Sequence, residues 1–190
     1  MREGESTVRD LSLHILNLIE NATQAGASVV SVCLVQNPET DSLHLVVEDN
    51  GPGIEVNPEE AMSPFYTTKE KHGKKTGLGL SLLRAAANQA DGDLKLGVSR
   101  MGGAAVEATM RLGHMDCPPL GDLAATLASV VCTNPELELH CHCRVGDKEC
   151  SVSVTDIANE LPKGQRAGLS LARRFSETVR DGLKSIDAVT

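Results

Sequence analysis

The sequence predicts an α/β protein in which a helix, two strands, a second helix and two more strands follow one another. Residues 7–25 carry apolar side chains at helical spacing, which indicates the first helix. Residues 29–36 and 43–49 are rich in Val and Leu and flank the turn "NPETD". Residues 93–112 alternate in polarity on either side of a Gly-Gly pair, which is typical of an antiparallel pair.

The first helix has signals at both ends. Thr7 is a suitable N-cap, with Asp10 three residues later as in a capping box, and Gly26 is suited to end the helix in a left-handed conformation. The apolar stripe between them consists of Leu11, Ile15, Leu18 and Ala22. The second helix is expected over "TGLGLSLLRAAANQA", ending near Asp91. The polar segment 55–76 between strand and helix has no sustained period, and a loop of that length is often a lid.

The chain is expected to divide into residues 1–113 and a small domain of residues 114–190. The segment "GHMDCPPLG" is typical of a linker because of its prolines and glycines. A helical stripe then leads to a hairpin, "ELELHCHCRV" and "KECSVSVT", and to an amphipathic helix ending near Ile186. This second part is too short for a large core, so we expect it to pack on the first part or on a partner.

Composition excludes several classes of function. The formal net charge of −8 argues against nucleic-acid binding, which depends on concentrated Lys and Arg. No segment has the apolar length of a membrane span, the first ten residues do not resemble a signal peptide, and a cytoplasmic location is expected. The six cysteines are then expected to be reduced thiols. Four lysines within residues 69–75 form a local cluster that suits either a solvated loop or a small polyanion.

Three features of residues 1–113 together favour a nucleotide site. Asn17 and Asn21 lie one turn apart on the first helix, and an amide oxygen is a ligand that Mg²⁺ accepts. Asp49 ends the second strand in "VVEDNGPGI", where a carboxylate can accept a hydrogen bond from the amine of adenine. Gly77 and Gly79 in "KKTGLGL" begin the second helix, whose free N–H groups form an anion site.

At these residues the sequence resembles a known family. "NLIENATQAGA", "EDNGPGI", "SPFYTTK" and "TGLGLSLL" are similar, in order, to the N, G1, F and G2 boxes of the GHKL superfamily, over residues 8–112. The resemblance implies a Bergerat-type two-layer sandwich, a mixed sheet with helices on one face that binds ATP and Mg²⁺. It implies that Asn21 binds the metal, Asp49 the adenine and Gly77 and Gly79 the phosphates. The residues expected to contact nucleotide are Asn21, Asp49, Gly51, Gly53, Ile54, Lys69, Lys75, Thr76, Gly77, Leu78, Gly79 and Leu80.

One departure from the family pattern bears on catalysis. Members that hydrolyse ATP carry a Glu four residues before the metal-binding Asn, where this chain has Asn17, and an amide cannot act as a general base. Sensor histidine kinases have Asn there, so the chain resembles their ATP-binding domain most. The candidate catalytic residues are Asn17 and, as the remaining carboxylate, Glu20. Only seven residues precede the first helix, so the phosphoacceptor is expected on another protein, with His14 as the intramolecular alternative.

The second part adds a cysteine question. Strand alternation places Cys141 and Cys143 on one face and the intervening histidines on the other, so the four cannot converge on one ion. Two interpretations remain for the cysteines. Cys141 and Cys143 could bind a metal together with Cys150 or Cys132, or the cysteines could pack as small apolar residues. "PPLGDLAATL" shows a faint likeness to small ATPases encoded alongside iron-hydrogenase genes.

The sequence therefore leads to a histidine-kinase-like protein that binds Mg·ATP and phosphorylates, or regulates, a separate partner. The partner classes considered are a response regulator, a regulatory factor and a redox enzyme. Two alternatives remain: a module that senses ATP or ADP without turnover, and a Ser/Thr kinase of the anti-sigma-factor type.

Overall fold

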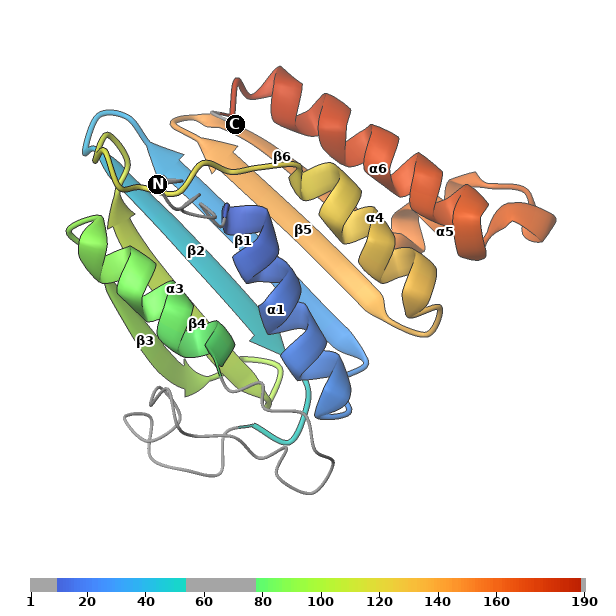
Figure 1. Ribbon diagram of the computed structural model, residues 1–190. Coiled ribbons are helices and arrows are strands. Elements are labelled where there is room, and N and C mark those ends of the chain that lie inside the picture. Colours follow the sequence, from blue (N-terminus) through green and yellow to red (C-terminus); the bar gives the residue numbers. More distant parts are fainter. Residues whose placement is uncertain (1–9, 54–77, 189–190) are drawn as a thin grey trace, which may run out of the picture.

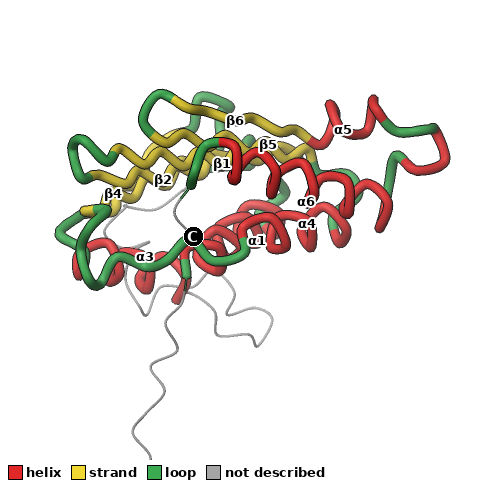
Figure 2. Tube along the Cα trace, turned by 90° about the horizontal axis from the view of Figure 1, so that it is seen from above, coloured by secondary structure: helices red, strands yellow, loops and turns green. Residues whose placement is uncertain are grey.

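A computed structural model describes residues 10–53 and 78–188. Its six strands form one mixed sheet in the order β3-β4-β2-β1-β5-β6. Helices α1, α3, α4 and α6 lie on one face of this sheet, so the molecule has two layers (Figures 1 and 2). The predicted α/β class, with a mixed sheet and helices on one face, is confirmed.

Helix α1, Leu11–Gln24, packs its apolar stripe into the core between the layers. Its N-cap is Asp10, whose carboxylate accepts a hydrogen bond from the Leu13 N–H, so the predicted cap at Thr7 is wrong. The C-terminal signal is confirmed, since Gly26 has a φ of 97°. The Ala27 N–H donates to the Ala22 carbonyl, which completes a Schellman motif.

Strands β1, Val29–Asn37, and β2, Ser42–Asp49, confirm the two strands predicted on either side of the turn "NPETD", and they pair antiparallel. Their helix-facing side chains are buried, including Val30, Val32 and Leu45. Because Val30 lies opposite Asp49 in the register, the end of β2 lies beside the start of β1.

Helix α3, Leu78–Gln89, is followed by strands β3, Asp93–Val98, and β4, Ala104–Arg111. Gly92 makes the turn from α3 into β3 possible, because a Cβ there would lie 1.8 Å from the Thr109 carbonyl oxygen. The predicted loop 55–76 lies outside the described residues.

Residues 114–188 extend the same sheet. Helix α4 is Leu123–Thr133, strands β5 and β6 are Glu138–Val145 and Lys148–Ser153, and helix α6 is Gly168–Ser185. Strand β5 pairs in parallel with β1, which confirms that this part packs on the first part. Whether residues 114–190 form a domain of their own stays a prediction.

One element in this part was missed. The sequence alternation carried the second hairpin strand through Thr155, but helix α5, Val154–Glu160, begins directly after Ser153. The Ser153 hydroxyl accepts a hydrogen bond from the Asp156 N–H, so a serine at the end of the strand caps the helix. A 3₁₀ helix, Lys163–Gln165, then connects α5 to α6.

The linker joins the second part to α1. The Pro119 and Leu120 carbonyls accept hydrogen bonds from the N–H groups of Leu11 and Ser12, at 2.9 and 3.0 Å. Gly121 lies against the capping carboxylate of Asp10, since a Cβ at this glycine would be 2.3 Å from it. The first turn of α1 is therefore built partly from the linker. Within the described residues, no helix has the combination of length and apolar character that a bilayer crossing requires.

Candidate functional site

Asp49 lies at the end of β2 and is almost buried, with 9% of its surface exposed. One of its carboxylate oxygens, Oδ1, accepts hydrogen bonds from the N–H of Gly51, at 2.7 Å, and of Ala104, at 3.3 Å. The other, Oδ2, receives no hydrogen bond from any residue in the described ranges. A carboxylate oxygen can only accept hydrogen bonds, so Oδ2 of this nearly buried residue suits a ligand that offers a donor.

Three glycines allow the backbone to surround this carboxylate. A Cβ at Gly103 would lie 2.2 Å from Asp49 Oδ1, which leaves no room for any side chain. A Cβ at Gly51 would lie 3.0 Å from the same atom. Gly53 has a φ of 82°, a conformation that favours glycine. The turn after β2 and the turn between β3 and β4 thus close on Asp49 together, and the Gly103 N–H also donates to the Asp49 carbonyl, at 3.1 Å.

A second group of predicted residues meets where α1 faces the start of α3. A Cβ at Gly79 would lie 3.5 Å from Asn17 Cβ and 3.7 Å from Asn21 Nδ2, so α3 begins directly beside both amides. The Asn17 amide donates to the Leu13 carbonyl at 2.9 Å. The Asn21 side chain makes no hydrogen bond to the part of the chain that the structure describes, so its oxygen is available to a cation.

These two groups lie at the same end of the molecule. Helix α1 ends, β2 ends and α3 begins at the lower edge of the sheet in Figure 1. They are connected through the residues after α1, since a Cβ at Gly51 would lie 3.5 Å from Ala27 Cβ. The structure therefore brings Gly51 and Gly53 together around the Asp49 carboxylate. It brings Asn17, Asn21 and Gly79 together where α1 faces the start of α3.

The remaining predicted residues divide into two sets. Glu20 is exposed on α1, one position from Asn21 and thus turned about 100° from it. Leu78 is the first residue of α3, and Leu80 packs against the core. The others lie outside the described residues; they are Ile54, Lys69, Lys75, Thr76 and Gly77.

Sequence reasoning missed three residues around Asp49. Gly103 was assigned only to a turn and Ala104 only to the strand after it, because nothing local indicates which strand end that turn approaches. Asn50 was treated as part of a turn signal, although its side chain makes several hydrogen bonds across the sheet. Only the register of β2 with β4 and β1 reveals these roles.

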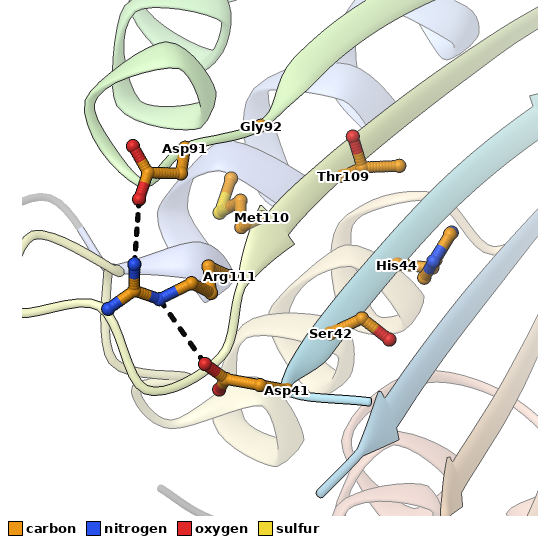
Figure 3. A pocket seen from close by; sticks show the side chains of 8 residues that line it. All are labelled: Asp41, Ser42, His44, Asp91, Gly92, Thr109, Met110 and Arg111. Atoms are coloured by element: carbon orange, nitrogen blue, oxygen red, sulfur yellow. Dashed lines mark hydrogen bonds and ion pairs between the residues drawn. The ribbon is translucent and has the colours of Figure 1, made fainter. Parts of the chain in front are cut away.

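A cavity of about 270 Å³ lies elsewhere, at the other end of β2. Asp41, Asp91 and Arg111 contribute to its lining, and Figure 3 shows the Arg111 guanidinium between the two carboxylates. The guanidinium lies 3.2 Å from Asp41 Oδ2 and 2.9 Å from Asp91 Oδ2. Because these acids already balance its charge, this cavity is a poor site for phosphate.

The cysteines of the second hairpin face the helices. Cys141 and Cys143 are buried with their Sγ atoms 3.8 Å apart, and Cys143 lies opposite Cys150 in the register. The hydrogen bond with the Cys143 thiol, together with burial, raises the pKa of Cys150 well above its ordinary value. Across the described part of the chain, no group of three or more His, Cys, Asp or Glu side chains is arranged to hold a metal ion.

Comparison with known proteins identifies the family. Residues 7–114 match the model of the histidine kinase-, DNA gyrase B-, and HSP90-like ATPases, which covers more than half of the chain. The chain therefore belongs to this family, and it carries the family's ATP-binding domain.

Individual relatives agree with this assignment. The aerobic respiration control sensor protein ArcB of Escherichia coli is 38% identical over 86 residues, 41% of this chain and 11% of ArcB. The osmosensing histidine protein kinase SLN1 of Saccharomyces cerevisiae is 40% identical over 67 residues, 33% of this chain and 5% of SLN1. The matched segment is thus a small fraction of each relative's length.

A solved structure resembles more of the chain. The N-terminal domain of a DNA repair protein superposes with a TM-score of 0.50 over 92% of this chain and 58% of that chain, at 15% identity. This similarity concerns the fold alone.

Proposed function

We propose that this chain binds Mg·ATP between the end of β2 and the facing ends of α1 and α3. The observation that carries the proposal is the buried Asp49 carboxylate, with one oxygen held by backbone N–H groups and the other without a donor among the described residues. The exocyclic amine of adenine is the donor that such an oxygen recognises, whereas a base with a carbonyl at that position would be repelled. Gly51 and Gly103 let the backbone approach the other oxygen of Asp49 closely and so fix the carboxylate.

The amides of α1 suit the metal. Asn21 offers a carbonyl oxygen, and Mg²⁺ tolerates a single protein ligand while it keeps water and phosphate oxygens as the rest of its shell. Gly79 leaves space where α3 begins, beside Asn21, so that phosphate oxygens can approach the helix N-terminus. Roles for Gly77, Lys69, Lys75 and Thr76 in holding phosphate rest on the family resemblance. When bound, Mg·ATP supplies a transferable γ-phosphoryl group.

Asn17 bears on the fate of the bound nucleotide. Its amide nitrogen donates to the Leu13 carbonyl, and an amide cannot remove a proton from water near neutral pH. Glu20, the other candidate, points away from Asn21 by about 100°. Slow hydrolysis and transfer of the phosphoryl group to a side chain of a separate protein are therefore the proposed course. The partner would be a response regulator, a regulatory factor or a redox enzyme.

The same observation favours a second candidate function. If the site supplies no base and no acceptor, the chain senses ATP and ADP and changes its hold on a partner without turnover. A Ser/Thr kinase of the anti-sigma-factor type fits less well, because such kinases carry a Glu at the position of Asn17.

Incubation of the purified protein with γ-labelled ATP and cell extract separates these functions. Transfer of label to another protein supports the kinase. A product that is labile in acid but stable in alkali identifies a phosphohistidine, one labile in both identifies an acyl phosphate, and an acid-stable product identifies Ser or Thr. Binding of ATP without transfer supports the sensor. Absence of ATP binding would contradict the whole proposal.

A further inference from the structure

Asn50 connects the candidate site to the centre of the sheet. It lies between Asp49 and Gly51, both of which belong to the proposed adenine site. Its side-chain oxygen accepts hydrogen bonds from the N–H groups of Ser28 and Val29, both at 2.9 Å. Its side-chain nitrogen donates to the Ser28 hydroxyl, at 3.0 Å. The Asn50 N–H donates to the Val29 carbonyl, at 3.2 Å.

The segment that Asn50 holds is itself fixed. Val29 is the first residue of β1, between β2 and β5, and it lies opposite Glu138 of the parallel strand. The Ser28 carbonyl accepts a hydrogen bond from the Glu138 N–H, at 2.9 Å. Asn50 therefore attaches the turn after β2 to the interior of a sheet, which is the rigid support that a recognition group on a loop requires.

The attachment acts on the carboxylate through the backbone. Asp49 Oδ1 accepts from the Gly51 N–H, so the place of Gly51 decides how the carboxylate is turned and where Oδ2 points. Without the Asn50 side chain, the N–H groups of Ser28 and Val29 lose their acceptor, and of the Asn50 bonds to this segment only the one from its backbone N–H to the Val29 carbonyl remains.

We propose that Asn50 is a positioning residue for base recognition: it fixes the turn that aims the free oxygen of Asp49 at the amine of a purine. The inference rests on the proposed function. Both polar atoms of the Asn50 side chain bond to Ser28 and Val29, so its proposed effect acts through Asp49 and is confined to ligands that offer a donor at that point.

A comparison of ATP with inosine triphosphate tests this role, because inosine triphosphate has the same ribose and phosphates but a carbonyl in place of the amine. Removing the side chain in N50A should weaken ATP binding about tenfold, on the order of one hydrogen bond to a charged group, and leave the dissociation constant of inosine triphosphate within about twofold. N50D keeps an acceptor for both N–H groups. Its added charge acts equally on both triphosphates, so the preference for ATP should remain within about threefold of wild type.

If N50A weakens the binding of both triphosphates equally, the role of Asn50 is merely structural and the inference is overturned. It is also overturned if N50A binds both triphosphates as wild type does. Should N50A fail to fold, N50S, whose shorter hydroxyl can replace only part of the attachment, should still lower the preference. The D49N variant separates the two proposals. If D49N loses the preference for ATP over inosine triphosphate but N50A keeps it, only the proposal for Asn50 is contradicted. If D49N keeps the preference, the assignment of Asp49 to adenine is itself contradicted.

Discussion

Replacement of Asp49 by Asn is the most informative single change. Asn has the same shape, and its oxygen can still accept from the Gly51 and Ala104 N–H groups, so the fold should persist. The amide nitrogen would then occupy the position of Oδ2 and present a donor to the amine of adenine, which is also a donor. The change therefore removes a hydrogen bond to a charged group, and such bonds contribute about 1.5–3 kcal/mol.

This energy translates into a measurable shift. A loss of about 1.5–3 kcal/mol raises the dissociation constant of ATP roughly 10- to 150-fold, since 1.4 kcal/mol corresponds to tenfold. At 100 times its dissociation constant, Mg·ATP stabilises the wild-type protein by about 2.7 kcal/mol. For a chain of this size that energy is a rise of about 5–11 °C in Tm. A 100-fold weaker site would retain only about 0.4 kcal/mol, or roughly 1–2 °C.

Differential scanning fluorimetry with and without Mg·ATP measures both shifts. D41N is the matched control, because Asp41 lies near the opposite end of β2, paired with Arg111, and its loss should leave the ATP-induced shift unchanged. A D49N protein that folds and keeps the wild-type shift would refute the reasoning.

Three further predictions concern the support of the site and the core. G103A should destabilise the protein by about 1–3 kcal/mol in urea unfolding, because its Cβ would lie 2.2 Å from the site carboxylate, whereas G97A, with no atom within 4 Å, should cost much less. G121A should destabilise by about 2 kcal/mol, since this glycine has a φ of 72° and lies against the capping carboxylate of α1; an unchanged Tm would contradict that packing. The hydrogen bond with the Cys143 thiol, together with burial, raises the pKa of Cys150 in the folded protein. Its contribution to the free energy of unfolding is therefore complete below the unfolded thiol pKa of about 8.5 and falls as pH rises above that value. The free energy of unfolding, measured as a function of pH, should fall less in C150S than in wild type, and equal slopes would contradict this.

Local signals predicted most elements of the fold. The apolar stripe of α1, the Val- and Leu-rich runs of β1 and β2, and the alternation on either side of the Gly-Gly pair before β4 are all signals that extend over a few residues. Errors arose where two local signals compete. Thr7 and Asp10 are both good caps, and the structure uses Asp10, which the linker also contacts. The run "SVSVT" alternates like a strand, but Ser153 caps a helix in the middle of it.

The residues of the candidate site could be predicted from the sequence, but the residues that hold them in position could not. Asp49, Asn21 and Gly79 belong to short motifs whose order along the chain resembles a family. The contacts of Asn50 with Ser28, and of Gly103 with Asp49, join residues 22 and 54 positions apart. Such contacts depend on strand order. The parallel pairing of β5 with β1 also depends on strand order, because the two strands are far apart in the sequence and no short turn connects them.

A crystal structure of the protein with Mg²⁺ and a non-hydrolysable ATP analogue tests the central claim most directly. The account predicts the adenine amine within hydrogen-bond distance of Asp49 Oδ2, and the Asn21 side-chain oxygen about 2.1 Å from the metal. A nucleotide bound in the cavity near Arg111, or one whose base lies away from Asp49, would contradict it.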